Sequence, residues 1–354
     1  MIGIARPWPI CPRPQHDESV PSWFERVGHE YTMSRAVLLA AVEREIAGTM
    51  PASAVLPADR LLERPFTEKL AALGQLTDPE KSCLWPPPSD WELKDQAFGV
   101  YCPHCCLNDL ANNRTPYGRQ YWLQSWCTIC KAHGSALVIR KQTHIDSNRS
   151  PWSHTDLKHD REFLASNRYR DLKVPSHPEL RSTLLGCLLY IERTTAAAIS
   201  GVLPDAWSWG KLAAVEFLTI LTDVTTWSLT HFEPVRSWSV AEDLTPTEEQ
   251  EGYGLIGRVR RMSASEYGGS RITRTLRDVS NPKVRAAALW TAHALLATCH
   301  IAASDRASGK STQDRQTTLL STAAPAGRQW LAQRQALWPP EYRRERWIEL
   351  RSLA

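Results

Sequence analysis

Five cysteines and two histidines lie in one short segment, which runs from Tyr101 to Val138 and reads "YCPHCCLNDLANNRTPYGRQYWLQSWCTICKAHGSALV". The whole chain of 354 residues has nine cysteines. The N-terminal stretch "MIGIARPWPICPRPQHDES" has no apolar core and no cleavage pattern of a secretory signal, so we expect a reducing, cytoplasmic setting. In such a setting clustered thiols bind metal more often than they form disulfides. The segment therefore predicts a metal site.

Two close pairs of ligands separated by a loop are an economical way to build a tetrahedral zinc site. Cys102 and Cys105 form the first pair, with C-x-x-C spacing. Two alternatives exist for the second pair. Cys127 with Cys130 gives a four-cysteine site, and Cys130 with His133 gives three cysteines and one histidine. Unligated buried cysteines are the alternative, but the double-turn spacing argues against them. Either complete set fills all four positions, which predicts a structural metal with no place for substrate or water.

The chain around these pairs indicates a small ribbon. The stretch "RQYWLQSW", Arg119 to Trp126, alternates enough to predict a strand, and "GSALVIR", which follows His133, predicts the returning strand. Gly134 suits the turn out of the site. Because so small a ribbon buries little surface, we expect the metal to hold it folded.

Two parts of the chain resemble the TniQ family, over roughly residues 7 to 140. "CPHC" and "YWLQSWCTICKAHGSAL" resemble the family signature: Cys-Pro-x-Cys, a later Trp-rich stretch, then Cys-x-x-His-Gly-x-x-Leu. The N-terminal stretch "PICPRPQHDESVPSWFERVGHEYTMS" is similar to the family's opening. The residues that carry this second similarity are Glu18, Ser19, Ser22, Trp23 and Arg26.

The resemblance implies a role in DNA recombination. TniQ proteins and the related TnsD-type selectors are target-selection adaptors of transposition and do not cut DNA. They bind a target DNA directly or dock onto an RNA-guided CRISPR effector complex, and they recruit an AAA+ ATPase that brings the transposase complex. The same partners are expected for this chain, with a homodimer as a further assembly and no membrane. The family's zinc ligands fall on Cys102, Cys105, Cys130 and His133, which leaves Cys106 and Cys127 as additional thiols.

We expect a mainly α fold with a small zinc ribbon. The predicted parts are an N-terminal helical region (1–98), a zinc-binding β-ribbon (99–145), a polar connector (146–179) and a C-terminal helical domain (180–354). The first region should hold helices over Val20–His29, Arg35–Gly48 and Leu62–Asp78. The first two helices form either a helix-turn-helix or an ordinary helical hairpin. The apolar stretch Ala286–Ala303 predicts a core helix and not a membrane span.

Positive charge gathers between Arg258 and Arg285, where seven arginines and one lysine face only Glu266 and Asp278. Ser270 could cap a helix here, with Ile272, Leu276 and Val279 directed inward. The flanking Arg271, Arg274 and Arg277 would then suit phosphate groups or an acidic partner. A solvated helix face is the alternative.

The sequence lacks the motifs of common enzyme classes. We find no Walker A motif, no nucleophile elbow and no HExxH, and none of the 17 glycines makes a phosphate-cradling loop. A nuclease or integrase-type enzyme would need carboxylates that hold two metal ions, for which a helical C-terminal half is a poor host. A zinc-dependent DNA-binding transcriptional regulator is the other alternative, and it would act as a homodimer on a fixed duplex site. The net charge of +4 points only weakly toward nucleic acid, so local charge must decide that question. Because the enzyme motifs are missing and the chain resembles the TniQ family, we predict a non-enzymatic adaptor.

Overall fold

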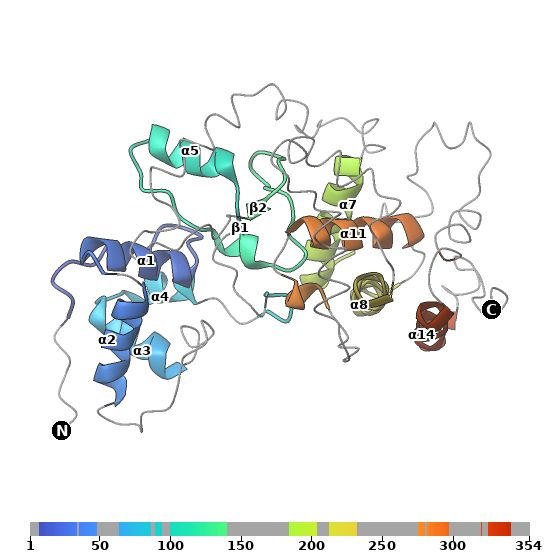
Figure 1. Cartoon of the computed structure of the whole chain (residues 1–354), viewed down its shortest axis with the longest axis horizontal. Helices are drawn as coiled ribbons and strands as arrows, with labels where there is room; N and C mark the ends of the chain where they lie inside the picture. The colour runs from blue at the N-terminus through green and yellow to red at the C-terminus, as the bar shows by residue number, and fades with distance from the viewer. Residues whose placement is uncertain are drawn as a thin grey trace. The chain divides into compact units, whose positions relative to one another are not determined.

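The computed structural model describes residues 7–33, 35–47, 64–85, 89–93, 100–139, 184–203, 212–231, 275–279, 282–296, 320 and 325–340. These residues are mainly helical, as predicted (Figure 1). They group into two compact units, one that reaches to residue 133 and includes 137–139, and one that includes 134–136 and all described residues from 184 onward. Over the described part of the chain, no helix is long and apolar enough to cross a membrane. The predicted polar connector lies outside the described residues, and the predicted domain boundaries stay predictions.

The first unit begins with four helices, α1 (Val20–Glu30), α2 (Arg35–Ala47), α3 (Arg64–Leu73) and α4 (Asp78–Leu84). The first two helices are confirmed nearly to the residue. A single helix over Leu62–Asp78 is wrong, because α3 ends at Leu73 and Asp78 already begins α4. Gln75 takes a left-handed φ of 48°, and a capping box of Thr77 and Glu80 starts the next helix.

Helix α1 supplies the centre of the first core. Ser19 caps the helix by accepting a hydrogen bond from the backbone N–H of Ser22 at 3.4 Å. Trp23 and Val27, one turn apart, are fully buried, and Tyr31, a further turn along, is half-buried. The core cluster consists of Val20, Trp23, Phe24, Val27, Leu38, Val42, Phe66, Leu70, Ala71, Leu73, Leu76 and Leu84.

The ligand-rich segment combines two short strands with two helices. Strand β1 (Val100–Tyr101) pairs antiparallel with β2 (Val138–Ile139). A strand after His133 is thus confirmed at residues 138–139, but its partner is β1 and not the stretch 119–126. Helix α5 (Pro103–Ala111) follows β1 directly, and a 3₁₀ helix, η2 (Gln120–Leu123), lies between the two ligand pairs.

The strand predicted over Arg119–Trp126 is therefore wrong. The backbone of this stretch bonds to separate segments instead of one ladder. Gln120 N–H donates to the carbonyl of Asp17 at 2.8 Å, and Ser125 N–H donates to the carbonyl of Trp91 at 2.6 Å. These isolated contacts bend the stretch into a turn of 3₁₀ helix.

The second unit is a set of packed helices, α7 (Leu184–Ile199), α8 (Ala214–His231), α11 (Pro282–Leu296) and α14 (Pro325–Gln335). Helix α8 packs against the other three. The predicted core helix is confirmed over the described part of Ala286–Ala303, where Ala286, Ala288, Leu289, Ala292, Leu295 and Leu296 are buried. Asp223 on α8 also accepts hydrogen bonds from Arg334 Nε at 2.7 Å and Trp338 Nε1 at 2.8 Å.

The helix expected after Ser270 is wrong over its described part, residues 275–279. Thr275 is extended, and only Leu276–Asp278 form a short 3₁₀ turn, η6. The Asp278 carboxylate accepts hydrogen bonds from both the N–H and the hydroxyl of Thr275, at 2.8 Å each, so a new turn starts where the helix should continue. Leu276 and Val279 are buried as expected.

Candidate metal centre

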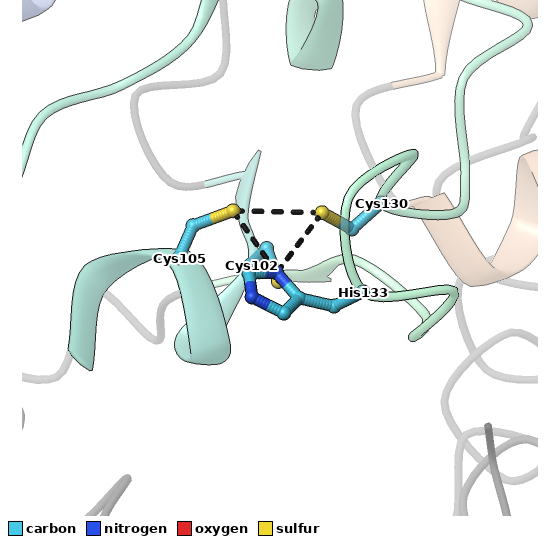
Figure 2. A group of neighbouring side chains, drawn as sticks. All are labelled: Cys102, Cys105, Cys130 and His133. Atoms are coloured by element: carbon cyan, nitrogen blue, oxygen red, sulfur yellow. Dashed lines mark hydrogen bonds between the residues drawn. The ribbon is translucent and has the colours of Figure 1, made fainter. Parts of the chain in front are cut away.

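The side chains of Cys102, Cys105, Cys130 and His133 converge on one point (Figure 2). Their ligand atoms, three Sγ atoms and one ring nitrogen, all lie within 4.8 Å of one another. The Sγ atoms of Cys105 and Cys130 are 3.5 Å apart. His133 Nδ1 lies 3.3 Å from Cys105 Sγ, 3.6 Å from Cys130 Sγ and 3.7 Å from Cys102 Sγ.

Local structure places each of these groups. Cys102 follows β1 as the N-cap residue of α5, and Cys105 lies in the first turn of that helix. Cys130 and His133 belong to a tight turn, which Gly134 leaves with a left-handed φ of 62°. The three cysteines are buried and His133 is half-buried. The N-terminal end of a helix favours negative charge, so α5 suits two thiolates at its start.

The arrangement fits a tetrahedral metal ion. With Zn–S near 2.3 Å and Zn–N near 2.0 Å, tetrahedral geometry separates the ligand atoms by about 3.5 to 3.8 Å. Four of the six separations between these atoms run from 3.3 to 3.7 Å, and all six are within 4.8 Å, so the cluster is close to the size that a tetrahedral ion requires. The cluster can thus hold a metal ion through four protein ligands.

The protonation of the cluster also favours a cation. Hydrogen bonds from Cys102 and Cys105 hold the pKa of the Cys130 thiol well below its ordinary value. Hydrogen bonds to Cys102 and Cys130, together with burial, raise the pKa of Cys105. A divalent cation bound among these sulfurs would favour the ionised form of all three thiols.

The two additional thiols lie apart from this point. Cys127 is fully buried, and its Sγ lies 3.5 Å from the carbonyl oxygen of Ile129. Cys106 is fully buried in α5. Among the described residues, neither joins the group of ligand atoms that converge. The structure thus brings together the three-cysteine, one-histidine set and not the four-cysteine set.

A buried ion pair that no sequence pattern indicated joins Arg119 to α5, the helix that begins at the first ligand pair. Arg119 Nη2 donates to both carboxylate oxygens of Asp109 on α5, at 2.8 and 2.9 Å. Arg119 also donates to the carbonyl of Tyr117 at 3.0 Å and lies over the Tyr117 ring, 4.1 Å from its centroid. Ten residues separate the two charges, across a loop, so no helical or strand spacing could have indicated the pair.

The residues of the family-like opening form a second buried network. Glu18 is fully buried and accepts four hydrogen bonds: from Gln15 N–H at 2.9 Å, Ser22 Oγ at 3.0 Å, Arg26 Nε at 2.9 Å and Arg26 Nη2 at 2.6 Å. Ser22 Oγ in turn accepts from Gly118 N–H at 2.8 Å. This network ties the start of α1 to the loop between the ligand pairs.

Of the three arginines predicted to bind a partner, only Arg277 is described; it is half-buried in η6. Arg271 and Arg274 lie outside the described residues. Arg285, from the same basic segment, is fully buried and donates to the carbonyl of Val279 at 3.0 Å. That arginine is part of the core and is removed from any contact surface.

In the comparison with known protein families, residues 9–137 match the TniQ family model. Comparisons with curated proteins and with solved structures give no match. The matched region contains the Glu18 network, helices α1 to α5 and all four convergent side chains. The match supports TniQ family membership for the part of the chain over residues 9–137.

Proposed function

We propose that this protein is a non-catalytic target-selection adaptor for DNA transposition. The TniQ domain implies a transposition-associated role in target selection. More specifically, we propose that the protein links a target to the transposon AAA+ ATPase and through it to the transposase. The target is either a DNA site or an RNA-guided CRISPR effector complex.

The observation that carries the proposal is a closed cluster of four ligands inside the TniQ domain. We propose that Cys102, Cys105, Cys130 and His133 hold one structural Zn²⁺ ion. Three thiolates and one imidazole are ligands that zinc prefers, and a full set of four protein ligands leaves no position for substrate or water. The metal would hold a surface in shape and take no part in chemistry.

Reconstituted transposition tests the adaptor function. The purified protein is combined with the ATPase and transposase of its own element, a donor DNA and a target, and insertions are mapped by sequencing. Insertion at the specific target should require this protein, and the protein should co-elute with the ATPase or with the target complex. A stable homodimer on a fixed duplex site without ATPase contact would instead identify a transcriptional regulator.

Catalytic activity is tested separately. The purified protein should hydrolyse neither ATP nor DNA, because the sequence lacks the motifs for both reactions. Metal-dependent DNA cleavage that disappears in a carboxylate variant would identify a nuclease and overturn the adaptor proposal.

We further propose that Arg271, Arg274 and Arg277 contact a polyanion or an acidic partner. The support is the excess of positive charge in the segment 258–285. The predicted helical edge gives no support, because Arg277 lies in a short 3₁₀ turn. If the ligand is nucleic acid, the triple change to Gln should weaken binding at low salt and lower the salt slope by about one unit per lost phosphate contact. Normal targeted insertion by the folded triple variant would remove this surface from the proposal.

A further inference from the structure

The hydroxyl of Tyr121 lies 3.3 Å from the Sγ atom of Cys130. Tyr121 belongs to η2, the 3₁₀ helix between the two ligand pairs, and is half-buried. Its ring packs edge-on against Trp122, with centroids 5.9 Å apart, and the Lys131 ammonium lies 5.3 Å from the ring centroid. The phenol is therefore held by its neighbours in a fixed position beside the sulfur.

We propose that Tyr121 is a positioning residue of the metal centre, whose hydroxyl donates a hydrogen bond to the Cys130 thiolate and favours Cys130 over Cys127 as the third sulfur ligand. The inference rests on the proposed metal site. A metal-bound cysteine carries no proton, so the phenol must be the donor.

Charge gives the physical reason for such a donor. A divalent ion with three thiolates and one neutral imidazole has a net charge of about −1, and buried charge needs hydrogen-bond donors around it. Cys102 and Cys105 have the N-terminal end of α5 beside them. Cys130 comes from outside that helix, and the Tyr121 hydroxyl supplies a donor there.

Cys127 has a hydrogen-bond acceptor beside its sulfur. Its Sγ lies 3.5 Å from the Ile129 carbonyl oxygen, an acceptor that a thiol can satisfy but that repels a thiolate. Cys130 thus lies next to a donor and Cys127 next to an acceptor, although both have the same C-x-x-C spacing. Groups that orient and stabilise metal ligands from outside the coordination sphere often change metal affinity by a factor of about 10 to 100.

The test compares Tyr121→Phe with Tyr117→Phe in the full chain. Tyr117 is a matched control, since its hydroxyl bonds to the His16 carbonyl at 3.4 Å and to Asp17 at 3.3 Å. Competition with a chromophoric chelator should show that Tyr121→Phe binds zinc about 10-fold more weakly than wild type. Tyr117→Phe should bind zinc as wild type does.

Alkylation of the zinc-loaded protein distinguishes loss of the Tyr121 hydrogen bond from a general loosening of the metal site. Loss of the donor leaves more electron density on one sulfur, so iodoacetamide should modify Cys130 faster in Tyr121→Phe, with Cys102 and Cys105 unchanged in peptide mapping. Equal acceleration at all three cysteines would overturn the proposal, and so would wild-type affinity together with wild-type alkylation.

The remaining outcomes are also decisive. A wild-type protein that purifies folded and without zinc, and takes none up, would end the metal-site proposal and this inference with it. If Tyr121→Phe does not fold, 3-fluorotyrosine at position 121 keeps the ring and makes the hydroxyl a stronger donor. Cys130 should then react more slowly than in wild type, and an unchanged rate would refute the role of Tyr121.

Discussion

At the scale of single residues, the ligand sulfurs and the additional thiols should respond differently to substitution. We predict that Cys130→Ser loses the bound zinc and unfolds the ligand-rich segment, because structural zinc binding contributes on the order of 10 kcal/mol. Cys127→Ala and Cys106→Ala are the matched controls and should keep one zinc per chain. Elemental analysis and thermal melting measure both effects. Loss of zinc in Cys127→Ala, with retention in His133→Ala, would establish the four-cysteine set instead.

Cys11 gives a residue-scale prediction about pH. Burial raises the pKa of the Cys11 thiol to about 11, in spite of the nearby Arg13 and Arg26 charges. Only the thiolate reacts with alkylating reagents, so at pH 8 Cys11 should react roughly 100-fold more slowly than an ordinary exposed cysteine. Its rate should rise about tenfold per pH unit until the pH reaches the pKa near 11. Rapid labelling at pH 8, measured by peptide mapping in folded protein, would contradict the buried environment.

At the scale of elements, the position of α1 depends on the Glu18 network. Glu18→Ala would leave Arg26, whose side chain is only 11% exposed, without its buried carboxylate. Breaking a buried pair on one side typically costs about 3 to 5 kcal/mol, so urea unfolding should show a loss of that order. Lys81→Ala is the control, because its pairing with the exposed Asp78 should contribute about 0.5 kcal/mol or less. Similar losses in both variants would mean that the Glu18 network does not stabilise α1.

At the scale of the whole molecule, metal removal should act on one unit and spare the other. In the first unit, Ser19 N–H bonds to the Gly118 carbonyl and Gln120 N–H to the Asp17 carbonyl, so the loop between the ligand pairs also holds the start of α1. Chelation should therefore increase hydrogen exchange at these amides as well as in the ligand turns. Helices α8 and α11, in the second unit, should keep their protection. An exchange increase confined to residues 127–134 would show that the metal supports its own turn alone.

The second unit supplies the reverse test at the same scale. Asp223→Asn replaces the carboxylate that accepts from Arg334 and Trp338 and should destabilise the packing of α14 on α8. Because Asp223 is buried, a loss of about 1 to 3 kcal/mol is expected in the second unit. Zinc content and the exchange of α1 amides should not change. A loss of zinc in this variant would show that the units depend on each other.

The sequence by itself determined the features that depend on residues close together in the chain. The paired spacing around Cys102, Cys105, Cys130 and His133 indicated a metal site, because two tight turns supply four ligands locally. The helices predicted over Val20–His29, Arg35–Gly48 and Ala286–Ala303 also depend on local pattern, since each helix closes its own hydrogen bonds.

Only the tertiary structure decided which groups meet across the chain. Spacing alone left Cys127 and His133 as alternatives, and the family resemblance favoured His133. The structure shows His133 beside the three sulfurs and the Tyr121 hydroxyl beside Cys130. The stretch 119–126 alternates like a strand, yet its N–H groups bond to Asp17 and Trp91, whose positions no local pattern contains. Partners from distant segments fixed these features, because a buried polar group takes whichever partner the fold brings within hydrogen-bonding distance.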